Sequence, residues 1–162
     1  MKQQTLAFEA IGTRWSITVE HNLAPAVWQD VEQRLHARID EFDMAYSRFR
    51  ADSLVTQMSK RAGTYDLPAD GYKLLAFYEK LYKLSNGRIT PLIGQVVSDA
   101  GYDAEYSLQS KSLQQPPAWD DVISYTEQSI TLAQPAILDF GAAGKGYEGW
   151  PVPFGNSGSC LR

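Results

Sequence analysis

The sequence contains very little cysteine and histidine. Among its 162 residues there is one cysteine, Cys160, and there are two histidines, His21 and His36. A single cysteine excludes a framework of intramolecular disulfides. Neither histidine has an acidic partner at the spacing that metal ligands use, so we expect both at the surface and not at a metal ion.

The sequence also lacks a long apolar run and a surplus of positive charge. It has 15 Lys and Arg against 19 Asp and Glu, a net charge of −4, which argues against a nucleic-acid partner. Met1–Thr5 is not followed by the apolar stretch of a signal peptide, and no segment is apolar enough to span a membrane. We therefore expect a cytoplasmic protein without a membrane partner.

Hydrophobic periodicity predicts two strands and two helices in the first half of the chain. Leu6–Val19 alternates apolar and polar residues around Gly12, as in two short strands joined by a tight turn. The predicted first helix begins at Pro25, and its apolar face consists of Trp28, Val31, Leu35, Ile39 and Phe42. A second helix is expected over Ala69–Ser85, with Asp70 as its possible cap and Gly87 beyond its end.

The second half of the chain predicts strands and an exposed loop. Ser107–Asp120 is rich in Ser, Gln and Pro, which favours a loop. Val122–Tyr125 and Ser129–Leu132 suit a hairpin, and Ala136–Phe140 suits a buried strand. Helices and antiparallel strands are segregated along the chain, so the predicted class is α+β, an antiparallel sheet with two packed helices. Residues 148–162 are dense in Gly, Pro and Ser and are expected to form a tail.

One glycine-rich segment suggests phosphate binding. In Asp139–Gly146 an apolar stretch ends in a carboxylate, small residues follow, and a lysine adds positive charge. The Walker pattern fails because Gly146 follows Lys145 where Ser or Thr is required. A dinucleotide pattern matches literally, but Trp150-Pro151 stands where a helix should begin. From the residues alone, a phosphate-binding loop and a plain glycine-rich turn both remain open.

Two further segments have both a functional and a plain interpretation. Ser85–Gly94 places Arg88 and Thr90 beside a rigid proline, yet it equally suits a helix end followed by a turn. In Tyr46–Ser53 two arginines flank Phe49, which suits either stacking of a ring and binding of a phosphate, or a solvated helix end.

Taken together and in this order, five segments resemble the FAD:protein FMN transferase (ApbE-type) family. Ala10–Thr13 resembles the Ala-Met-Gly-Thr turn of that family, and Ser47–Ser53 resembles its Ser-x-(Tyr/Phe)-x-x-x-Ser segment. Gly87–Pro91 stands where the family has Gly-x-Phe-Asp-Pro, and Ala100–Tyr102 where it has Trp-Gly-Phe. Asp139–Tyr147 is similar to Asp-Leu-Gly-Gly-Ile-Ala-Lys-Gly-Tyr and is the most specific block. The resemblance makes residues 1–147 the N-terminal part of an ApbE-like domain.

The resemblance implies binding of FAD and, with Mg²⁺, transfer of its FMN half to a Ser or Thr hydroxyl of an acceptor protein, releasing AMP. The residues that the resemblance places along the flavin nucleotide are Ile11, Phe49, Arg88, Ile89 and Thr90. Asp139 and Lys145 are implied to hold polar parts of the cofactor, and the backbone carbonyl of Ala142 to bind the metal. No catalytic side chain is carried over.

The chain departs from the family pattern at three places. Ile11 replaces a methionine, Thr90 replaces an aspartate, and residues 148–162 stand where the family continues into a half with further metal ligands. Mg²⁺ prefers octahedral oxygen coordination anchored by carboxylates, so we expect a truncated domain with impaired or absent transferase activity. The alternatives are a non-catalytic flavin or nucleotide binder and a self-associating structural protein. Exposed sheet edges in such a domain further predict a homo-oligomer.

Overall fold

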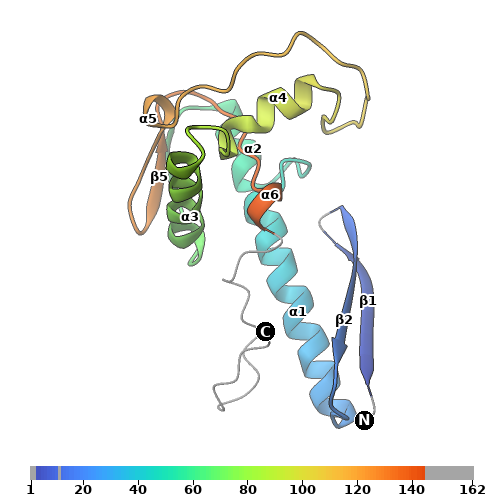
Figure 1. Ribbon diagram of the computed structural model, residues 1–162. Coiled ribbons are helices and arrows are strands. Elements are labelled where there is room, and N and C mark those ends of the chain that lie inside the picture. The colour runs from blue at the N-terminus through green and yellow to red at the C-terminus, as the bar shows by residue number, and fades with distance from the viewer. Residues whose placement is uncertain (1–2, 11, 145–162) are drawn as a thin grey trace. The chain divides into compact units, whose positions relative to one another are not determined.

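The computed structural model describes residues 3–10 and 12–144 (Figure 1). The described residues fall into two compact units, and the boundary between the units lies between Asp43 and Met44. Each unit is described separately below.

The first unit begins with an antiparallel hairpin. Strand β1 (Gln4–Ala10) pairs with β2 (Thr13–Val19) in a register that sets Gln4 opposite Val19 and Ala10 opposite Thr13. Gly12 has a φ of 64°, a left-handed conformation that glycine adopts without strain, and it allows the tight turn. The predicted pair of strands around this turn is confirmed.

Helix α1 (Pro25–Tyr46) follows the hairpin and begins at the predicted proline. Its buried residues in the first unit recur at helical spacing and are Val31, Leu35, Ile39 and Phe42. His36 is exposed, as expected, and its ring meets Phe8 of β1 edge-on at 5.1 Å. The predicted apolar face is therefore confirmed, with Trp28 half-buried at its end.

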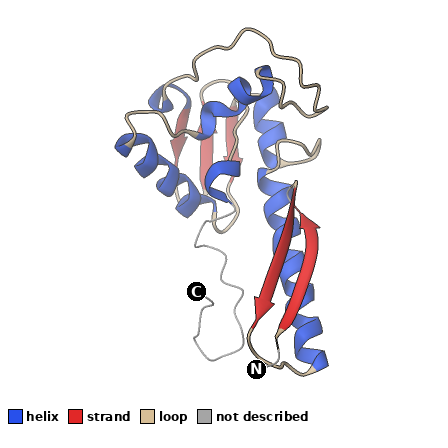
Figure 2. Ribbon diagram, turned by 45° about the vertical axis from the view of Figure 1, so that its right-hand side comes forward, coloured by secondary structure: helices blue, strands red, loops and turns tan. Residues whose placement is uncertain are grey.

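The second unit contains a three-stranded antiparallel sheet. Its strands are β3 (Gly63–Asp66), β4 (Ile123–Tyr125) and β5 (Ser129–Leu132), in the order β3-β5-β4 (Figure 2). The predicted β4–β5 hairpin is confirmed, whereas β3 was not predicted. Ile130 and Leu132 of the central strand are fully buried, so this strand supplies much of the core.

Helix α3 (Gly71–Leu84) is the second predicted helix, and it contributes buried Leu74, Leu75 and Tyr78. Asp70 precedes the helix but does not cap it, because its carboxylate instead accepts a hydrogen bond from the Tyr46 hydroxyl at 3.0 Å. At the other end Asn86 adopts a φ of 51°, and the Gly87 amide donates to the Tyr82 carbonyl at 2.8 Å. This arrangement is a Schellman-type helix end.

Several short elements of the second unit were not predicted from the sequence. They are α2 (Leu54–Lys60), the 3₁₀ helix η1 (Pro91–Ile93), α4 (Gly94–Asp99), α5 (Trp119–Val122) and α6 (Gly141–Gly144). Each is seven residues or shorter, and a helical period cannot be recognised over so few positions. The predicted loop Ser107–Asp120 is irregular up to residue 118 and exposed over 107–115, but its last two residues begin α5, where Trp119 is buried.

The predicted strand over Ala136–Phe140 is wrong, although its predicted burial is correct. Leu138 and Phe140 are buried, yet the segment is irregular. Its backbone amides are satisfied by other segments: Ala136 donates to the Met58 carbonyl at 3.3 Å, and Asp139 donates to the Pro91 carbonyl at 2.8 Å. The segment is held by these tertiary hydrogen bonds in place of a strand ladder.

The predicted α+β class is confirmed. The antiparallel strands form two small sheets where one was expected. The predicted tail over 148–162 lies outside the described residues. Among the helices of the described residues, none combines the length and hydrophobicity that crossing a membrane requires.

Candidate functional site

The second unit brings together two segments that lie 91 residues apart in the sequence. The Nε atom of Arg48, just beyond α1, donates to Oδ2 of Asp139 at 2.8 Å. The side chains are 6% and 20% exposed, so this ion pair is largely removed from water. The other oxygen of Asp139, Oδ1, accepts from the Gly141 amide at 2.7 Å, which anchors the carboxylate to the start of α6.

The guanidinium of Arg48 has one buried nitrogen without a partner. Nη2 is buried, and no hydrogen-bond acceptor reaches it among residues 3–10 and 12–144. Leaving a buried donor of a charged group unsatisfied costs free energy on the order of 1–3 kcal/mol or more. An unpaired buried donor therefore marks a position where a ligand would supply the missing acceptor.

Two aromatic side chains lie at this guanidinium and a third packs against both of them, and all three are partly exposed. The Arg48 Cζ atom lies 4.2 Å from the ring centre of Phe49 and 4.9 Å from that of Tyr102. The Tyr106 ring stacks on Phe49 with centroids 5.3 Å apart and planes 9° apart. Interaction with the Tyr106 side chain, followed by burial, raises the pKa of Tyr102 above its usual value. A cation next to accessible ring faces is a surface on which a flat ligand ring can stack.

A buried tyrosine supports the short helix after Asp139. The Tyr78 hydroxyl, from α3, accepts a hydrogen bond from the Ala143 amide at 3.2 Å. Its ring meets Phe140 at 5.4 Å in an edge-to-face arrangement. Burial raises the pKa of Tyr78 to about 12 and keeps its hydroxyl neutral. These two contacts with Tyr78 hold the segment that carries Asp139, Ala142 and Ala143 in place.

The second predicted contact segment, 88–90, is arranged differently. Thr90 is only 5% exposed, and its Oγ1 accepts from the Leu92 amide at 3.2 Å, which caps η1. Arg88 and Ile89 are exposed. The hydrogen bond between Pro91 and Asp139 connects this segment to the Asp139 backbone.

The predicted site residues thus have different outcomes. Phe49 and Asp139 lie at the Arg48 guanidinium, and Thr90 lies next to the residue that holds the Asp139 backbone. Ile11 and Lys145 lie outside the described residues, and their predicted contacts stay predictions.

The described residues fit the two implied groups, a flavin nucleotide and Mg²⁺, to different degrees. The unpaired Nη2 and the aromatic side chains suit a flavin nucleotide. For Mg²⁺, the carbonyl of Ala142 is the predicted ligand, but both oxygens of the adjacent Asp139 already accept hydrogen bonds. Within residues 3–10 and 12–144, no group of three or more His, Cys, Asp or Glu side chains lies close enough to hold a metal. The described residues therefore do not by themselves fit a magnesium ion.

Three contributing side chains were missing from the sequence-based site: Arg48, Tyr102 and Tyr106. Arg48 belongs to a segment that was singled out, and Tyr102 to a segment of the family resemblance, but nothing in the sequence pairs Arg48 with Asp139. Tyr106 carries no motif, and its position depends on the fold of the loop.

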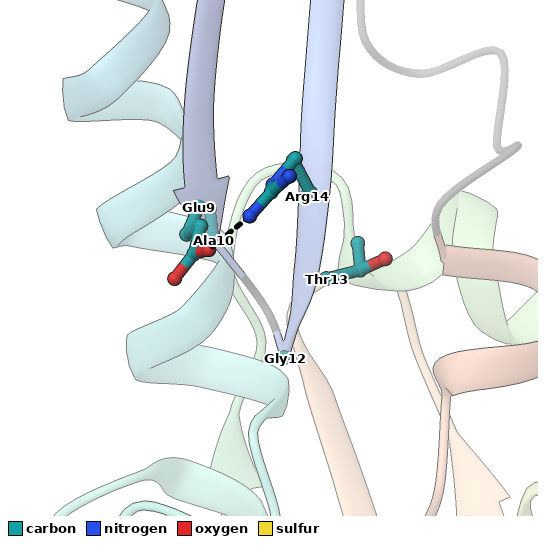
Figure 3. Close-up of a pocket in the computed structure, with 5 residues that line it drawn as sticks. All are labelled: Glu9, Ala10, Gly12, Thr13 and Arg14. Atoms are coloured by element: carbon teal, nitrogen blue, oxygen red, sulfur yellow. Dashed lines mark hydrogen bonds and ion pairs between the residues drawn. The ribbon is translucent and has the colours of Figure 1, made fainter.

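The first unit contains a separate pocket at the tip of its hairpin (Figure 3). The pocket measures about 570 Å³ and is lined by Glu9, Ala10, Gly12, Thr13 and Arg14. Its ion pair, Arg14 to Glu9 at 3.5 Å, is highly exposed on both sides. Exposed pairs contribute little free energy, so this pocket is a weaker candidate than the Arg48–Asp139 pair.

Comparison with known proteins gives the same assignment as the sequence motifs. The sequence model of the ApbE family matches residues 11–148. No curated protein sequence matches the chain significantly.

Several solved structures have a similar fold. A single-residue mutant of the flavin transferase ApbE from Vibrio cholerae has a TM-score of 0.72 and 13% identity, over 91% of this chain and 53% of that structure. The flavinyl transferase ApbE from Pseudomonas stutzeri, in its apo form, has a TM-score of 0.64 and 20% identity, over 90% and 52%. The ApbE protein from Thermotoga maritima has 0.67 and 14%, over 90% and 50%. The chain spans about half the length of these structures. Since the family model covers most of its residues, the chain belongs to the ApbE family.

Proposed function

We propose that this chain binds FAD and contributes to transfer of its FMN half to a Ser or Thr hydroxyl of an acceptor protein. The observation that carries the proposal is the buried Arg48–Asp139 pair, whose unpaired Nη2 lies beside partly exposed aromatic rings. Membership of the ApbE family supports the choice of a flavin over other flat ligands.

The residues divide the work of binding according to their chemistry. Phe49 offers a ring face for stacking, and Arg48 offers a hydrogen-bond donor. Arg88 and Ile89 are exposed and free to meet a ligand, whereas the hydroxyl of Thr90 is occupied as a helix cap. Ile11 and Lys145 remain proposed contacts. When bound, FAD supplies the diphosphate whose cleavage leaves FMN on the acceptor hydroxyl and releases AMP.

We derive no step through magnesium, which needs oxygen ligands beyond the Ala142 carbonyl. A second candidate function follows from the engaged carboxylate of Asp139, whose two oxygens accept from Arg48 and Gly141. A carboxylate held in this way supports a preformed binding position that holds a flavin without transferring it. The two functions share the binding site and differ only in AMP release.

The test is a titration of the purified chain with FAD, with and without Mg²⁺. Flavin fluorescence reports binding, and chromatography of the reaction mixture after removal of the protein reports released AMP. Saturable binding together with Mg²⁺-dependent AMP release, in the presence of a Ser- or Thr-containing acceptor protein, supports the transferase. Saturable binding without AMP release favours the non-catalytic binder. Absence of binding would refute both and leave a structural role.

We also propose that the chain self-associates. The hairpin of the first unit is a two-stranded sheet, and no further strand among the described residues pairs with its outer edges. Unpaired strand edges favour pairing with a second chain. Light scattering at several concentrations tests this, and a single monomeric species throughout would contradict it.

A further inference from the structure

We propose that this chain forms a two-fold dimer in which β1 pairs antiparallel with β1 of a second copy, with Ala7 opposite Ala7 of that copy. This inference rests on the self-association proposed above and assigns to it one strand edge and one register. It does not depend on flavin binding.

The first step concerns the free edge of the hairpin. β1 pairs with β2 on one side, and no other strand of the described residues pairs with its second side. Alternate residues of an antiparallel strand direct their N–H and C=O groups away from the existing partner, so a seven-residue edge offers several unused backbone groups. Edge strands usually avoid further pairing through proline, bulges or charge, above all lysine. β1 contains no proline, lysine or arginine and pairs with β2 without a bulge.

The second step selects β1 over β2. No residue of β1 is buried, whereas Val19 of β2 is. Leu6 and Phe8 of β1 are only half-buried, so a further strand beside β1 would cover apolar surface that the hairpin leaves accessible. β2 also carries Arg14, whose side chain is 82% exposed. A basic side chain on an edge strand discourages pairing.

The third step concerns the register. A two-fold axis at Ala7 pairs all seven residues of β1 with all seven of the second copy, and any other two-fold register pairs fewer. Half-buried Leu6 then lies opposite half-buried Phe8 of the second copy, and exposed Thr5 lies opposite exposed Glu9. Apolar side chains that face each other across two strands stabilise the pairing. A slip by one residue would set half-buried side chains opposite exposed ones.

The fourth step concerns charge. Glu9 is the one charged residue of β1, and two carboxylates directly opposite each other would oppose pairing. In this register each Glu9 meets the uncharged Thr5, and the two Glu9 residues are roughly 13 Å apart along the strand, beyond the screening length of about 8 Å at physiological salt. Each Glu9 also keeps Arg14 of its own hairpin at 3.5 Å. β1 is therefore complementary to itself, as a two-fold contact requires, and the occupant of its edge is a second copy.

The size of the contact predicts its strength. Seven residues from each chain are few compared with the roughly 20–30 residues that each partner contributes to a stable interface. We therefore expect a weak, concentration-dependent dimer with a dissociation constant on the order of 10 μM.

The first experiment is disulfide cross-linking of the full chain carrying Cys160→Ser, which removes its one native cysteine. Directly opposed Cα atoms of antiparallel strands are about 4.5–5.5 Å apart, within the range that a disulfide bridges. Ala7→Cys should therefore give a covalent dimer on oxidation with diamide, seen by non-reducing electrophoresis. Ser16→Cys is the matched control, because Ser16 is likewise exposed and lies opposite Ala7 on β2. It should stay monomeric.

The same background tests the register. Thr5→Cys alone and Glu9→Cys alone should not cross-link, because the two copies of each residue lie roughly 13 Å apart along the strand. A mixture of the two variants should cross-link, since Thr5 of one chain faces Glu9 of the other.

The second experiment measures the dimer without a covalent bond, by analytical ultracentrifugation over about 1–300 μM. Ala7→Lys sets two lysines opposite each other and should raise the dissociation constant about fivefold or more. Ser16→Lys should leave it within about twofold. Mixing Ala7→Lys with Ala7→Glu should restore dimers, which a misfolded variant would not do.

The outcomes separate this inference from the proposals above. Cross-linking of Ala7→Cys and of the Thr5→Cys and Glu9→Cys mixture, but not of Ser16→Cys, supports it, and so does weakening by Ala7→Lys. Cross-linking of Ser16→Cys, a mixture that stays monomeric, or an unchanged dissociation constant in Ala7→Lys overturns it. If wild type dimerises and Ala7→Cys does not cross-link, only this inference fails. If wild type is monomeric over the whole range, the proposed self-association fails with it, and flavin binding is unaffected in either case.

Discussion

Two segments of the second unit resemble nucleotide-contacting segments of the same family, yet the fold uses them in opposite ways. At Arg48 and Asp139 the charged side chains are only 6% and 20% exposed and are paired with each other. Along 88–90 the one buried side chain, Thr90, caps a 3₁₀ helix, while Arg88 and Ile89 are exposed. A motif residue can thus be held ready for a ligand or be used to build the backbone that supports the site. The four expectations below test this difference, beginning with the largest effect.

Breaking the buried pair should have the largest effect on stability. Asp139→Ala leaves the Arg48 guanidinium buried without a counter-charge and should lower the free energy of unfolding by about 3–5 kcal/mol. Urea denaturation followed by circular dichroism measures this change. As a control, Arg48→Met combined with Asp139→Leu removes both charges and should recover part of the loss. If Asp139→Ala lowers the free energy of unfolding by less than about 0.5 kcal/mol, the range of ordinary surface substitutions, the pair does not stabilise the fold as claimed.

Alkaline pH should reduce the stability that Tyr78 contributes through its contacts with the segment after Asp139. Burial raises the pKa of Tyr78 to about 12, whereas the unfolded chain titrates near 10. As pH rises, Tyr78 therefore loses its proton first in the unfolded state, which favours unfolding. The contribution of Tyr78 to the free energy of unfolding is intact below pH 10 and declines as pH rises towards 12. The loss should reach roughly 2–3 kcal/mol at pH 12.

The measurement for Tyr78 is the difference in stability between wild type and Tyr78→Phe over pH 8–12. The phenylalanine cannot titrate, so its stability should fall less steeply above pH 10. Parallel curves for the two proteins would show that Tyr78 has the same pKa in the folded and the unfolded state, which would contradict the expectation.

A close backbone approach makes Gly94 the next most sensitive position. A Cβ atom at residue 94 would lie 2.2 Å from the carbonyl oxygen of Ile137, which belongs to the segment leading to Asp139. Gly94→Ala should therefore displace this segment and cost about 1–3 kcal/mol of stability. Gly63→Ala is the comparison, because its Cβ atom would meet nothing within 4 Å and any loss there comes from backbone strain at a φ of 145° and not from close packing. Unchanged thermal denaturation of Gly94→Ala would refute the close packing.

The smallest effects are expected along 88–90. Thr90→Ala removes the cap of η1 and should cost about 1 kcal/mol, whereas Thr90→Ser keeps the hydroxyl and most of the stability. Arg88→Ala, at an exposed position, should change stability by less than about 0.5 kcal/mol. Thermal denaturation of the three variants ranks them. An Arg88→Ala effect larger than that of Thr90→Ala would reverse the distinction between structural and exposed residues in this segment.

The sequence was sufficient for elements that are long or marked by strong local signals. The alternation around Gly12 predicted the first hairpin, and the helical period from Pro25 predicted the buried face of α1. The segment Ala136–Phe140 was predicted as a strand because it is mostly apolar. Its amides bond instead to Met58 and Pro91, which no local pattern encodes.

The candidate site was predictable only in part. Phe49 and Asp139 were recognised through motifs, but their meeting at Arg48 depends on a contact across 91 residues. The contribution of Tyr106 depends on a left-handed backbone conformation at a non-glycine residue, which sequence patterns rarely indicate. Local motifs therefore identified candidate residues, and tertiary structure selected among them.

The most direct test of the central claim is an NMR titration of the isotope-labelled chain with FAD. If the Arg48–Asp139 pair is the flavin-binding position, the largest shifts should fall on the amides of Arg48, Phe49 and Tyr106 and on 139–143. The amides of the β4–β5 hairpin should remain unchanged. Saturable shifts confined to other segments, or no shifts at millimolar FAD, would contradict the assignment.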